Sequence, residues 1–558
     1  MTTLIAVVAL VIYLAFYFTF GRNLRDKLLQ SDKAPKAPSE RLADGVDYIP
    51  TNKFVLFGHH FASIAGAGPI TGPAIAVAWG WLPGLLWIWI GNVFLGSIHD
   101  YLSLTASVRY DGRSMQFVSQ DLIGKSSGKT FAWFILFLCI LVVAAFGDIV
   151  AGQFAGDGRV FFSFLFFCIA AIITGYFMYK TKLGLPGGSV IGLLLIIVAF
   201  WLGGMMQVKW TKDVYFLIIF VYIVLASTLP VNFLLQPRDY LSSFFLYFGL
   251  LVGGISAVIG FKPLDSLAPV ISLNAKVIGG VPSPFWPTVP LVVACGALSG
   301  FHSLVAAGTS SKQLAKEQDA LFVGYGAMLT EGFLSTLVVI SIAAFGKAAL
   351  GDKILATPAL GRFVQSFAKM VSTQLPFLPM SFMTLFAAVW VSTFALTTLD
   401  TTNRLGRYII QEMVLPLKEK ASGLYNFFGN KWAASLLIAA LGLFLAKSGG
   451  YSYLWPAFSG ANQLLASIVM LTVAVWVKKK MNPQYTMTVL IPAIFLWVTV
   501  TAALLWYEAF VIPTFFVATA TAAKKITGSI VGIMTAIMLV LNFVMIGGFL
   551  KNWKSKSA

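Results

Sequence analysis

The feature that most constrains this chain is an apolar run that contains its own helix breakers. Residues Phe57 to Pro73 lie in a stretch apolar enough to sit in a membrane, yet they include four glycines and two prolines, which weaken or break helices. Backbone groups released from a helix in hydrocarbon must find other partners, so a break is tolerated only where it faces protein, water or a bound solute. The sequence therefore predicts a broken helix at 57–73 that forms part of a site.

A second stretch repeats the pattern. The motif Gly-x-His, followed six residues later by glycine, occurs from Gly58 to Gly66 and again from Gly300 to Gly308, at an offset of 242 residues (300 − 58). Interrupted apolar segments at matching places in two halves indicate inverted repeats with a binding site between them. We therefore expect a second broken helix at 299–310, and three parts in the chain: an N-terminal membrane helix with a cytoplasmic loop (1–53), a first repeat (54–287) and a second, inverted repeat (288–558).

Composition extends this reading to the whole chain. Of its 558 residues 58% are hydrophobic and 11% charged, and the mean hydropathy is +0.85, which indicates an all-α polytopic integral membrane protein. We expect about 15 membrane helices, one leading helix and seven in each half. The net charge of +18 would suggest nucleic acid for a soluble protein, but about two thirds of the 39 lysines and arginines fall in alternate loops. This bias predicts an N-terminus outside, a C-terminus in the cytoplasm, and the lipid bilayer rather than nucleic acid as partner.

All four histidines lie within predicted spans: His59, His60, His99 and His302. Histidine titrates near physiological pH, so His60 and His302 are candidates for contacting a substrate or carrying a coupling proton. Each imidazole could equally form a hydrogen bond across a helix interface. A metal site built from the four histidines is an alternative that we do not favour, because no two of them stand at positions i and i+4.

Several acids lie within or at the edge of spans: Asp100, Asp148, Glu331 and Asp400. An ionisable side chain in hydrocarbon costs roughly 2.5 to 3.5 kcal/mol on insertion scales, so each should face a cavity or a partner. Glu331 lies halfway along its span and is the leading proton carrier, and Asp100 is a further coupling candidate. Neighbouring residues on a helix point about 100° apart, so His99 and Asp100 need not pair. For Asp400, in a threonine-rich helix end, we expect helix capping rather than cation binding.

A bound carboxylate would suit the exposed N–H groups of the broken helices, because helix N-termini attract anions. The candidate substrate-binding residues are His60, Ser63, Gly66, Gly68, Thr71, His302, Ser303, Gly308 and Thr309.

Other polar groups admit two readings. Asn232 and Gln236 precede Arg238, which is expected to pair with Asp239 or another acid, and Ser459, Asn462 and Gln463 open a later span. These clusters could contact a ligand or join helices. The three cysteines, one of which is Cys295, are read as packing residues. Two long outer segments, 261–288 and 344–379, are read as an extracellular cover or plain loop.

At this point the sequence resembles a known family, the carbon starvation protein A (CstA) family. The resemblance covers about Asp47 to Gln463, and the motifs that carry it are Pro50 to Pro69, Ser97-Ile-His-Asp100, Gln236-Pro-Arg-Asp-Tyr240 and Ser299-Gly-Phe-His-Ser303. It implies a prokaryotic plasma (inner) membrane carrier of the amino acid/polyamine/organocation superfamily, with a LeuT-like core, linked to peptide uptake in starvation or to proton-driven pyruvate uptake. That superfamily core has five plus five helices, whereas the offset leaves room for seven plus seven, and both arrangements remain open.

Together these observations predict a secondary active transporter, a proton-coupled symporter that imports short peptides or pyruvate by alternating access. Its partners would be a peptide or carboxylate substrate and a proton or other coupling cation, with no cofactor. The alternative is a channel or receptor-like membrane protein of the same fold with a His/Asp metal site. An enzyme is not expected, because the chain has no nucleophile elbow, P-loop or dense acid cluster.

Overall fold

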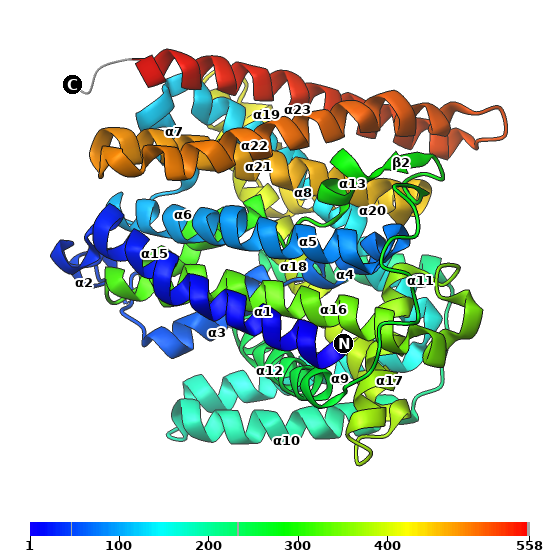
Figure 1. The fold of residues 1–558 in the computed structure, drawn as a ribbon. Coiled ribbons are helices and arrows are strands. Elements are labelled where there is room, and N and C mark those ends of the chain that lie inside the picture. The colour runs from blue at the N-terminus through cyan, green and yellow to red at the C-terminus, as the bar shows by residue number, and fades with distance from the viewer. Residues whose placement is uncertain (46, 231–233, 555–558) are drawn as a thin grey trace.

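The protein is a bundle of long helices that run side by side (Figure 1). The structure, a computed structural model, describes residues 1–45, 47–230 and 234–554, so the predicted polar residue Asn232 lies outside the described part. The long helices are α1 (Thr2–Phe16), α5 (Trp81–Gly91), α6 (Ser97–Arg109), α8 (Lys125–Gly156), α9 (Gly158–Lys180), α10 (Gly184–Met205), α11 (Lys212–Thr228), α12 (Leu235–Ile259), α16 (Ala327–Leu350), α18 (Met380–Val414), α20 (Lys431–Gly449), α21 (Tyr451–Lys480), α22 (Thr486–Trp506) and α23 (Ala522–Lys554).

Shorter elements lie mostly at the two ends of the bundle. They are α2 (Pro38–Arg41), α7 (Met115–Ile123), α15 (Ser311–Gln313), α17 (Ala359–Gln374), α19 (Ser422–Phe428) and the hairpin of β1 (Asn274–Lys276) and β2 (Pro282–Pro284). In Figure 1, α17 and the hairpin lie at one end, and α2, α7 and α15 lie at the other.

Among the described residues, twelve helical segments are long and apolar enough to cross a membrane, and one bent pair makes a thirteenth if it is counted as one span. The predicted count of about 15 is therefore not confirmed. Two predicted spans account for the difference. The first, at 213–230, corresponds to α11, which has only 17 residues. The second, at 288–309, is divided between the short helices α13 (Phe285–Val292) and α14 (Gly300–Val305).

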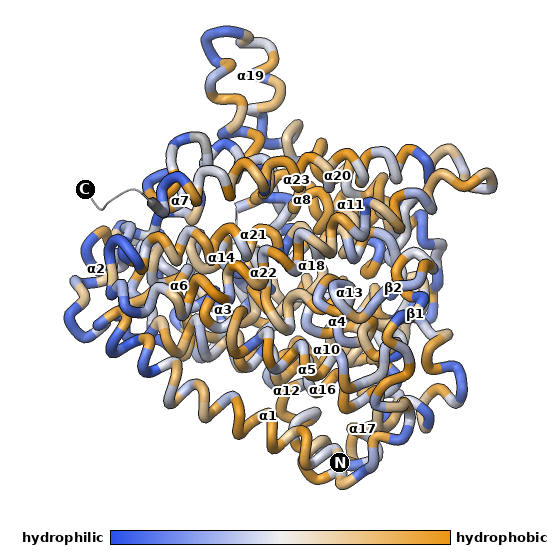
Figure 2. The backbone as a smooth tube through the Cα atoms, turned by 45° about the horizontal axis from the view of Figure 1, so that its top comes forward, coloured by the Kyte–Doolittle hydropathy of each residue, from blue (hydrophilic) through white to orange (hydrophobic). Residues whose placement is uncertain are grey.

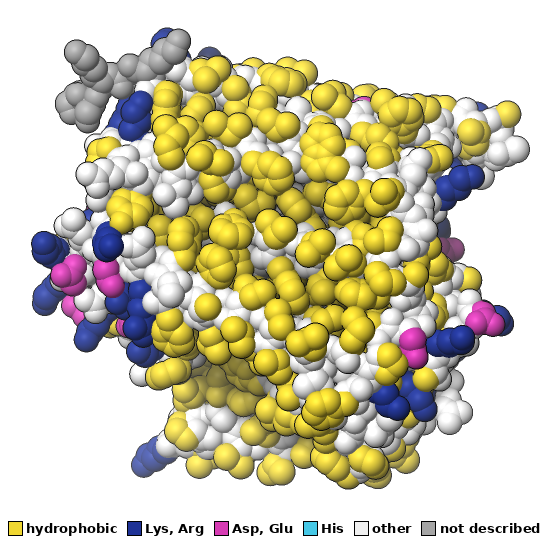
Figure 3. Space-filling view, in the orientation of Figure 1, with side chains coloured by type: hydrophobic (Ala, Val, Ile, Leu, Met, Phe, Trp, Pro, Cys, Tyr) yellow, Lys and Arg dark blue, Asp and Glu magenta, His cyan; other side chains and the backbone are white. Residues whose placement is uncertain are grey.

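The surface matches a membrane environment. Figure 3 shows a continuous hydrophobic face with charged side chains gathered at its left and right margins, and Figure 2 shows hydrophobic helices between hydrophilic ends. On α10, for example, Leu194, Ile197 and Trp201 are exposed. Because helices satisfy their own backbone groups, such apolar surfaces are stable in lipid.

The first predicted interruption is present. Helix α3 (Lys53–Ile64) begins at Asn52, whose side chain accepts the Phe54 N–H, and α4 (Gly68–Ala76) follows after three residues with Pro69 in its first turn. The two segments are bent by 48°. The sequence Ala-Gly-Ala between two helix-compatible segments, followed by Gly-Pro, places the break at 65–67.

The second interruption lies just before the stretch expected to hold it. Helix α13 (Phe285–Val292) ends at Val292, residues 293–299 are not helical, and α14 (Gly300–Val305) starts where the predicted 299–310 break begins. From Ala306 to Ser310 the chain continues as a π-helical turn, η6. The interruption is thus at 293–299, and the segment 299–310 is mostly helical.

The two broken elements meet at their interruptions. Helix α4 packs against α13, and α3 packs against α14. A Cβ atom on Gly72 would lie 2.6 Å from the Val292 carbonyl oxygen, and one on Gly68 would overlap the Cys295 side chain. Gly68 thus lies beside Cys295, and Gly72, four residues later, lies beside Val292, three residues earlier. The two elements therefore run in opposite directions.

The outer segment 344–379 is not a plain loop. Helix α16 continues to Leu350, and α17 follows from Ala359 to Gln374. Its buried residues include Phe363, Phe367 and Val371. These recur at spacings of four, which is a helical period, and they form one apolar stripe. The segment 261–288 is largely irregular apart from the β1–β2 hairpin.

Candidate functional site

Side chains of neighbouring helices donate hydrogen bonds to backbone carbonyls in and just before the second interruption. Carbonyl oxygens of residues 290–296 accept hydrogen bonds from Trp87 Nε1 (Val293 O, 3.1 Å), Asn92 Nδ2 (Gly296 O, 3.1 Å), Trp455 Nε1 (Val292 O, 3.0 Å) and Gln463 Nε2 (Pro290 O, 2.7 Å). The side-chain oxygen Oδ1 of Asn462 accepts the Phe301 N–H at 2.8 Å, at the start of α14. Since released backbone groups need such partners away from water, Asn462 and Gln463 join α21 to this interruption.

The first interruption is lined by small groups from three other elements. The Ser335 hydroxyl of α16 donates to the Pro69 carbonyl at 2.8 Å. A Cβ on Gly66 would lie 2.5 Å from Thr398 Oγ1 and 3.7 Å from the Phe146 ring. Glycine at this position therefore lets α18 and α8 approach the backbone closely.

Next to the second interruption lies a buried histidine–acid cluster, composed of His99, Asp100, His302 and Glu331. The two oxygens of Asp100 are each 2.7 Å from an imidazole Nδ1, one of His99 and one of His302. On its other side, His302 Nε2 is 3.5 Å from a Glu331 carboxylate oxygen. All four side chains are excluded from solvent. The sequence left the pairing of His99 with Asp100 open, and in the structure the Asp100 carboxylate bridges its own neighbour His99 and His302 of α14.

The cluster contains polar atoms without partners. Within the described chain, neither Glu331 oxygen, nor Nε2 of His99 or His302, has a hydrogen-bond partner. Buried polar groups are normally hydrogen-bonded, because an unpaired one is costly in a low-dielectric interior. These atoms therefore have unused capacity to bind a proton, an ion or a polar group.

His60 extends this polar region to the first broken element. Its Nδ1 lies 2.8 Å from Ser310 Oγ in η6, so the hydrogen bond joins α3 to the chain that follows α14. His60 is fully buried, and its Nε2 has no partner among the described residues.

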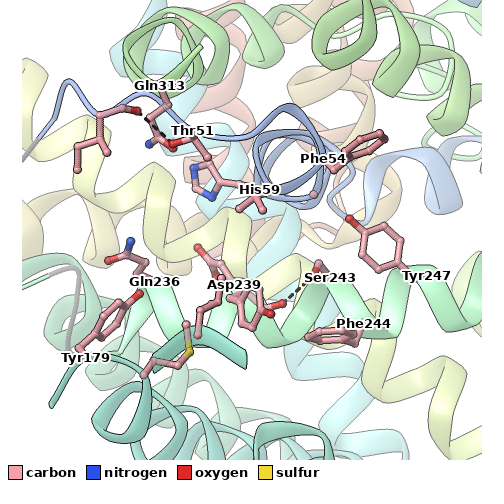
Figure 4. A pocket seen from close by; sticks show the side chains of 16 residues that line it. Thr51, Phe54, His59, Tyr179, Gln236, Asp239, Ser243, Phe244, Tyr247 and Gln313 are labelled. Atoms are coloured by element: carbon pink, nitrogen blue, oxygen red, sulfur yellow. Dashed lines mark hydrogen bonds between the residues drawn. The ribbon is translucent and has the colours of Figure 1, made fainter. Parts of the chain in front are cut away.

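His59, one residue earlier, lines a different space. A cavity of about 550 Å³ lies between α3 and α12. In Figure 4, His59 faces it from α3, and Gln236, Asp239 and Tyr247 surround it from α12. Neighbouring residues of α3 thus face two places, His60 the interior and His59 this cavity.

The predicted substrate-binding residues separate into two groups. Gly66 lies within the first interruption, Gly68 is the first residue of α4 and Thr71 is buried in α4, so these lie near the place where the broken elements meet. By contrast, the hydroxyls of Ser63 and Ser303 donate to carbonyls of their own helices. Gly308 is exposed with no heavy atom within 4 Å of a would-be Cβ, and Thr309 is half-buried.

Metal-ligand atoms come together in a set that differs from the predicted alternative. Ligand atoms of Cys295, His302 and Glu331 lie within 4.8 Å of one another. The set His59, His60, His99 and His302 does not form such a group in the part of the chain that the structure describes. Cys295, read from the sequence as a packing residue, therefore belongs to the site region.

Three further residues lie at the site: Asn92, Cys295 and Thr398. Asn92 escaped the sequence analysis, whereas Cys295 was read as a packing residue and Thr398 only as part of the threonine-rich helix end around Asp400. Asn92 carried a usable signal, since an amide inside an apolar span must have a partner. It donates to carbonyls of both Gly296 and Met328. Cys295 and Thr398 carried no comparable signal, because both residue types are common in membrane helices.

A second buried charge network lies on α12. Arg238 forms ion pairs with both Asp239 and Asp400, and its guanidinium also donates to the Tyr222 hydroxyl. Arg238 and Asp400 are completely buried. The predicted pairing of Arg238 is confirmed, whereas Asp400, expected to cap a helix, instead binds this cation across α12 and α18.

Comparisons with known proteins agree with this architecture. The family model described as "Carbon starvation protein CstA" matches residues 1–372 and 346–503. A solved structure of a manganese transporter from Eremococcus coleocola has a similar fold, with a TM-score of 0.50 and 11% sequence identity, covering 92% of this chain and 99% of that one.

Several named relatives are similar over most of their length. Peptide transporter CstA of Bacillus subtilis is 32% identical over 98% of this chain and 96% of its own. Peptide transporter CstA of Campylobacter jejuni is 31% identical over 88% of this chain and 78% of its own, and the pyruvate/proton symporter BtsT of Escherichia coli is 29% identical over 90% and 81%. With its many apolar helices, this chain is a multi-pass membrane protein that belongs to the carbon starvation protein CstA family.

Proposed function

We propose that the protein is a proton-coupled symporter that imports a small carboxylate-bearing nutrient, a short peptide or pyruvate, into the cell. The relatives support this choice, because they carry the names peptide transporter and pyruvate/proton symporter. The observation that carries the proposal is the buried histidine–acid cluster beside the second interruption.

Within that cluster, His302, Asp100 and Glu331 are assigned to the coupling proton. A carboxylate that binds two imidazoles, next to a second carboxylate without hydrogen-bond partners, offers more than one place for a proton. Intramembrane ionisable groups of this kind form proton relays in pumps and transporters. His60 is assigned a role in transmitting protonation to α3, because its bond to Ser310 joins the two broken elements.

The substrate carboxylate is assigned to the start of α4. The first N–H groups of a helix attract anions, and α4 begins at Gly68, beside Cys295 and the interruption. Pro69 has no N–H, and the N–H groups of Ile70 and Thr71 bond to the Ala67 carbonyl, so the Gly68 N–H is the donor assigned to the carboxylate. The site therefore combines an anion-binding helix end with a proton-binding cluster.

Transport would proceed by alternating access between the halves 54–287 and 288–558, treated as inverted repeats around a LeuT-like core. The antiparallel meeting of α4 and α13 supports this assignment. The positive-inside bias places the N-terminus outside and the C-terminus in the cytoplasm of a prokaryotic cell, with α17 and the β-hairpin on the outer face.

The test is uptake into proteoliposomes under an imposed pH gradient, with labelled pyruvate and labelled dipeptides. We expect accumulation above the outside concentration, abolished by a protonophore. His302→Ala, Asp100→Asn and Glu331→Gln should reconstitute normally but lose accumulation. Glu419→Gln, which removes an exposed carboxylate, is the control and should transport as wild type. Wild-type accumulation by all three cluster variants would refute the assignment.

A second candidate, a channel or receptor with a structural metal, is favoured by one observation, the proximity of Cys295, His302 and Glu331. Cysteine, histidine and carboxylate together suit Zn²⁺. A channel would only equilibrate the solute, and a metalloprotein would carry about one metal per chain in elemental analysis.

A further inference from the structure

Helix α17 carries a buried arginine whose charge has no acidic partner. Arg362 is only 7% exposed, and its guanidinium donates to three backbone carbonyls: Ala74 O at 2.9 Å, Thr357 O at 3.1 Å and Leu355 O at 3.3 Å. Among the described residues, no carboxylate lies within ion-pair distance of it, whereas the buried Arg238 binds two aspartates.

An arrangement of this kind needs an explanation, because a buried charge is normally paired. The Ala74 carbonyl lies in the last turn of α4, where the helix dipole favours a cation, and this offsets only part of the cost. Burial lowers the pKa of Arg362 to about 10, so the guanidinium still carries its charge at neutral pH.

Arg362 also lines a cavity. This space, of about 220 Å³, is bounded by Ile75, Val292, Tyr451, Ser452 and Trp455, and Arg362 is the one charged residue of its lining. Tyr451 also lines the adjacent cavity of about 610 Å³, in which Asp148 is already paired with Lys212 at 2.6 Å. No carboxylate thus competes for the guanidinium from within the smaller cavity.

The guanidinium has N–H groups that these three hydrogen bonds do not use. Of its five N–H groups, the three carbonyls use one on each nitrogen, which leaves one N–H on Nη1 and one on Nη2. One unused N–H on each of two nitrogens of the same guanidinium can serve the two oxygens of a carboxylate. A small monocarboxylate fits within a cavity of this size.

The position of the cavity relates it to the substrate site. Gly68, at the start of α4, and Ala74, which Arg362 contacts, are six residues apart on one helix, which corresponds to about 9 Å along its axis. The part of α4 that Arg362 contacts is therefore about 1.7 helical turns from Gly68, where α4 begins.

We propose that Arg362 binds the carboxylate of the incoming substrate in this cavity, as an outer station that the solute occupies before it reaches the start of α4. The inference rests on the proposed function and on α17 facing outward. The ligand class is a small monocarboxylate, either pyruvate or the C-terminal carboxylate of a short peptide, and the solute that wild type accumulates identifies which.

The competing explanation is that Arg362 has a purely structural role and only joins α17 to α4. Removal of a purely structural residue lowers the melting temperature and the maximal rate for any solute. Removal of a carboxylate-binding residue, by contrast, raises KM and abolishes the ligand-induced rise in melting temperature, whatever the loss of its three carbonyl hydrogen bonds costs the ligand-free protein.

The experiment measures KM and maximal uptake rate in proteoliposomes, and the melting temperature in detergent with and without pyruvate or dialanine. For Arg362→Gln we expect KM to rise at least about 30-fold and the ligand-induced rise in melting temperature to vanish. Arg362→Lys, which keeps the charge but not the fork of donors, should raise KM about tenfold. The control Lys369→Gln removes one positive charge from the same helix and should leave KM unchanged.

Each outcome decides the matter. An unchanged KM in Arg362→Gln, or a lower maximal rate with wild-type KM, overturns the inference and leaves the proposed function standing. If Arg362→Gln does not fold, a wild-type KM in Arg362→Lys overturns it equally. If wild type accumulates neither pyruvate nor dipeptide, the proposed function itself has failed.

Discussion

Gly72 offers a quantitative test of how the two broken helices meet. It is buried in α4, and a Cβ atom there would lie 2.6 Å from the Val292 carbonyl oxygen and 3.0 Å from the Val293 Cα. The first contact is about 0.8 Å short of the 3.4 Å at which ordinary van der Waals contact begins. Both atoms belong to the backbone, so no side chain can rotate away.

The expected cost of Gly72→Ala follows from two opposing terms. Overpacking a well-filled interior costs about 1 to 3 kcal/mol, and backbone neighbours place this site at the upper end. Alanine recovers up to about 1 kcal/mol through its higher helix propensity. We therefore expect a net loss of about 2 kcal/mol, together with slower uptake, because α4 and α13 must separate.

The assay is thermal unfolding in detergent combined with uptake in proteoliposomes. Gly547→Ala is the matched control, since nothing lies within 4 Å of its would-be Cβ on α23, and it should melt at or slightly above the wild-type temperature. If Gly72→Ala melts and transports as wild type, α4 and α13 do not pack as described.

Three further predictions concern other contacts. Arg238→Met should lower stability by about 3 to 5 kcal/mol, because it leaves buried aspartates unpaired, and Arg238→Met with Asp400→Leu should recover part of the loss; a double variant no better than the single one would contradict this. Asn92→Leu should cost about 1 to 3 kcal/mol, because the Gly296 and Met328 carbonyls lose their donor; a wild-type melting temperature would show that these carbonyls have other partners. For orientation, a membrane-impermeant maleimide should label Lys276→Cys in intact cells and Lys420→Cys only after lysis, with little background from the three buried native cysteines; the reverse pattern would invert the topology.

The first interruption was predictable from sequence and the second only approximately. Around Gly66 the helix breakers are local, since Gly68 and Pro69 follow at once. The non-helical residues 293–299 contain one glycine and no proline, so nothing local forbids a helix there. The interruption is instead fixed by hydrogen bonds from Asn92, Trp87 and other distant side chains, which a single sequence does not reveal.

For the ionisable groups, the sequence likewise indicated which residues matter but not which residues pair. His302, Asp100 and Glu331 were each singled out as intramembrane ionisable groups, and the structure brings them together. Which acid binds which base depended on helix packing, so Asp400 was expected to cap a helix and instead pairs with Arg238. The helix α17 was missed because the segment 344–379 was read as an extracellular cover or plain loop, although its apolar residues Phe363, Phe367 and Val371 recur at a helical spacing of four.

The pairing of α3 with α14, and of α4 with α13, divides the interior chemically. Every histidine–acid contact described lies on the α3–α14 side of the interruptions, and the unpaired Arg362 lies on the other side. Under the proposed orientation and function, a solute moving inward would pass the Arg362 cavity before it reaches the histidine–acid cluster. The two sides of the pathway would then be chemically different, so the affinity for solute presented from the cytoplasm should differ from that for solute presented from outside, even without a pH gradient.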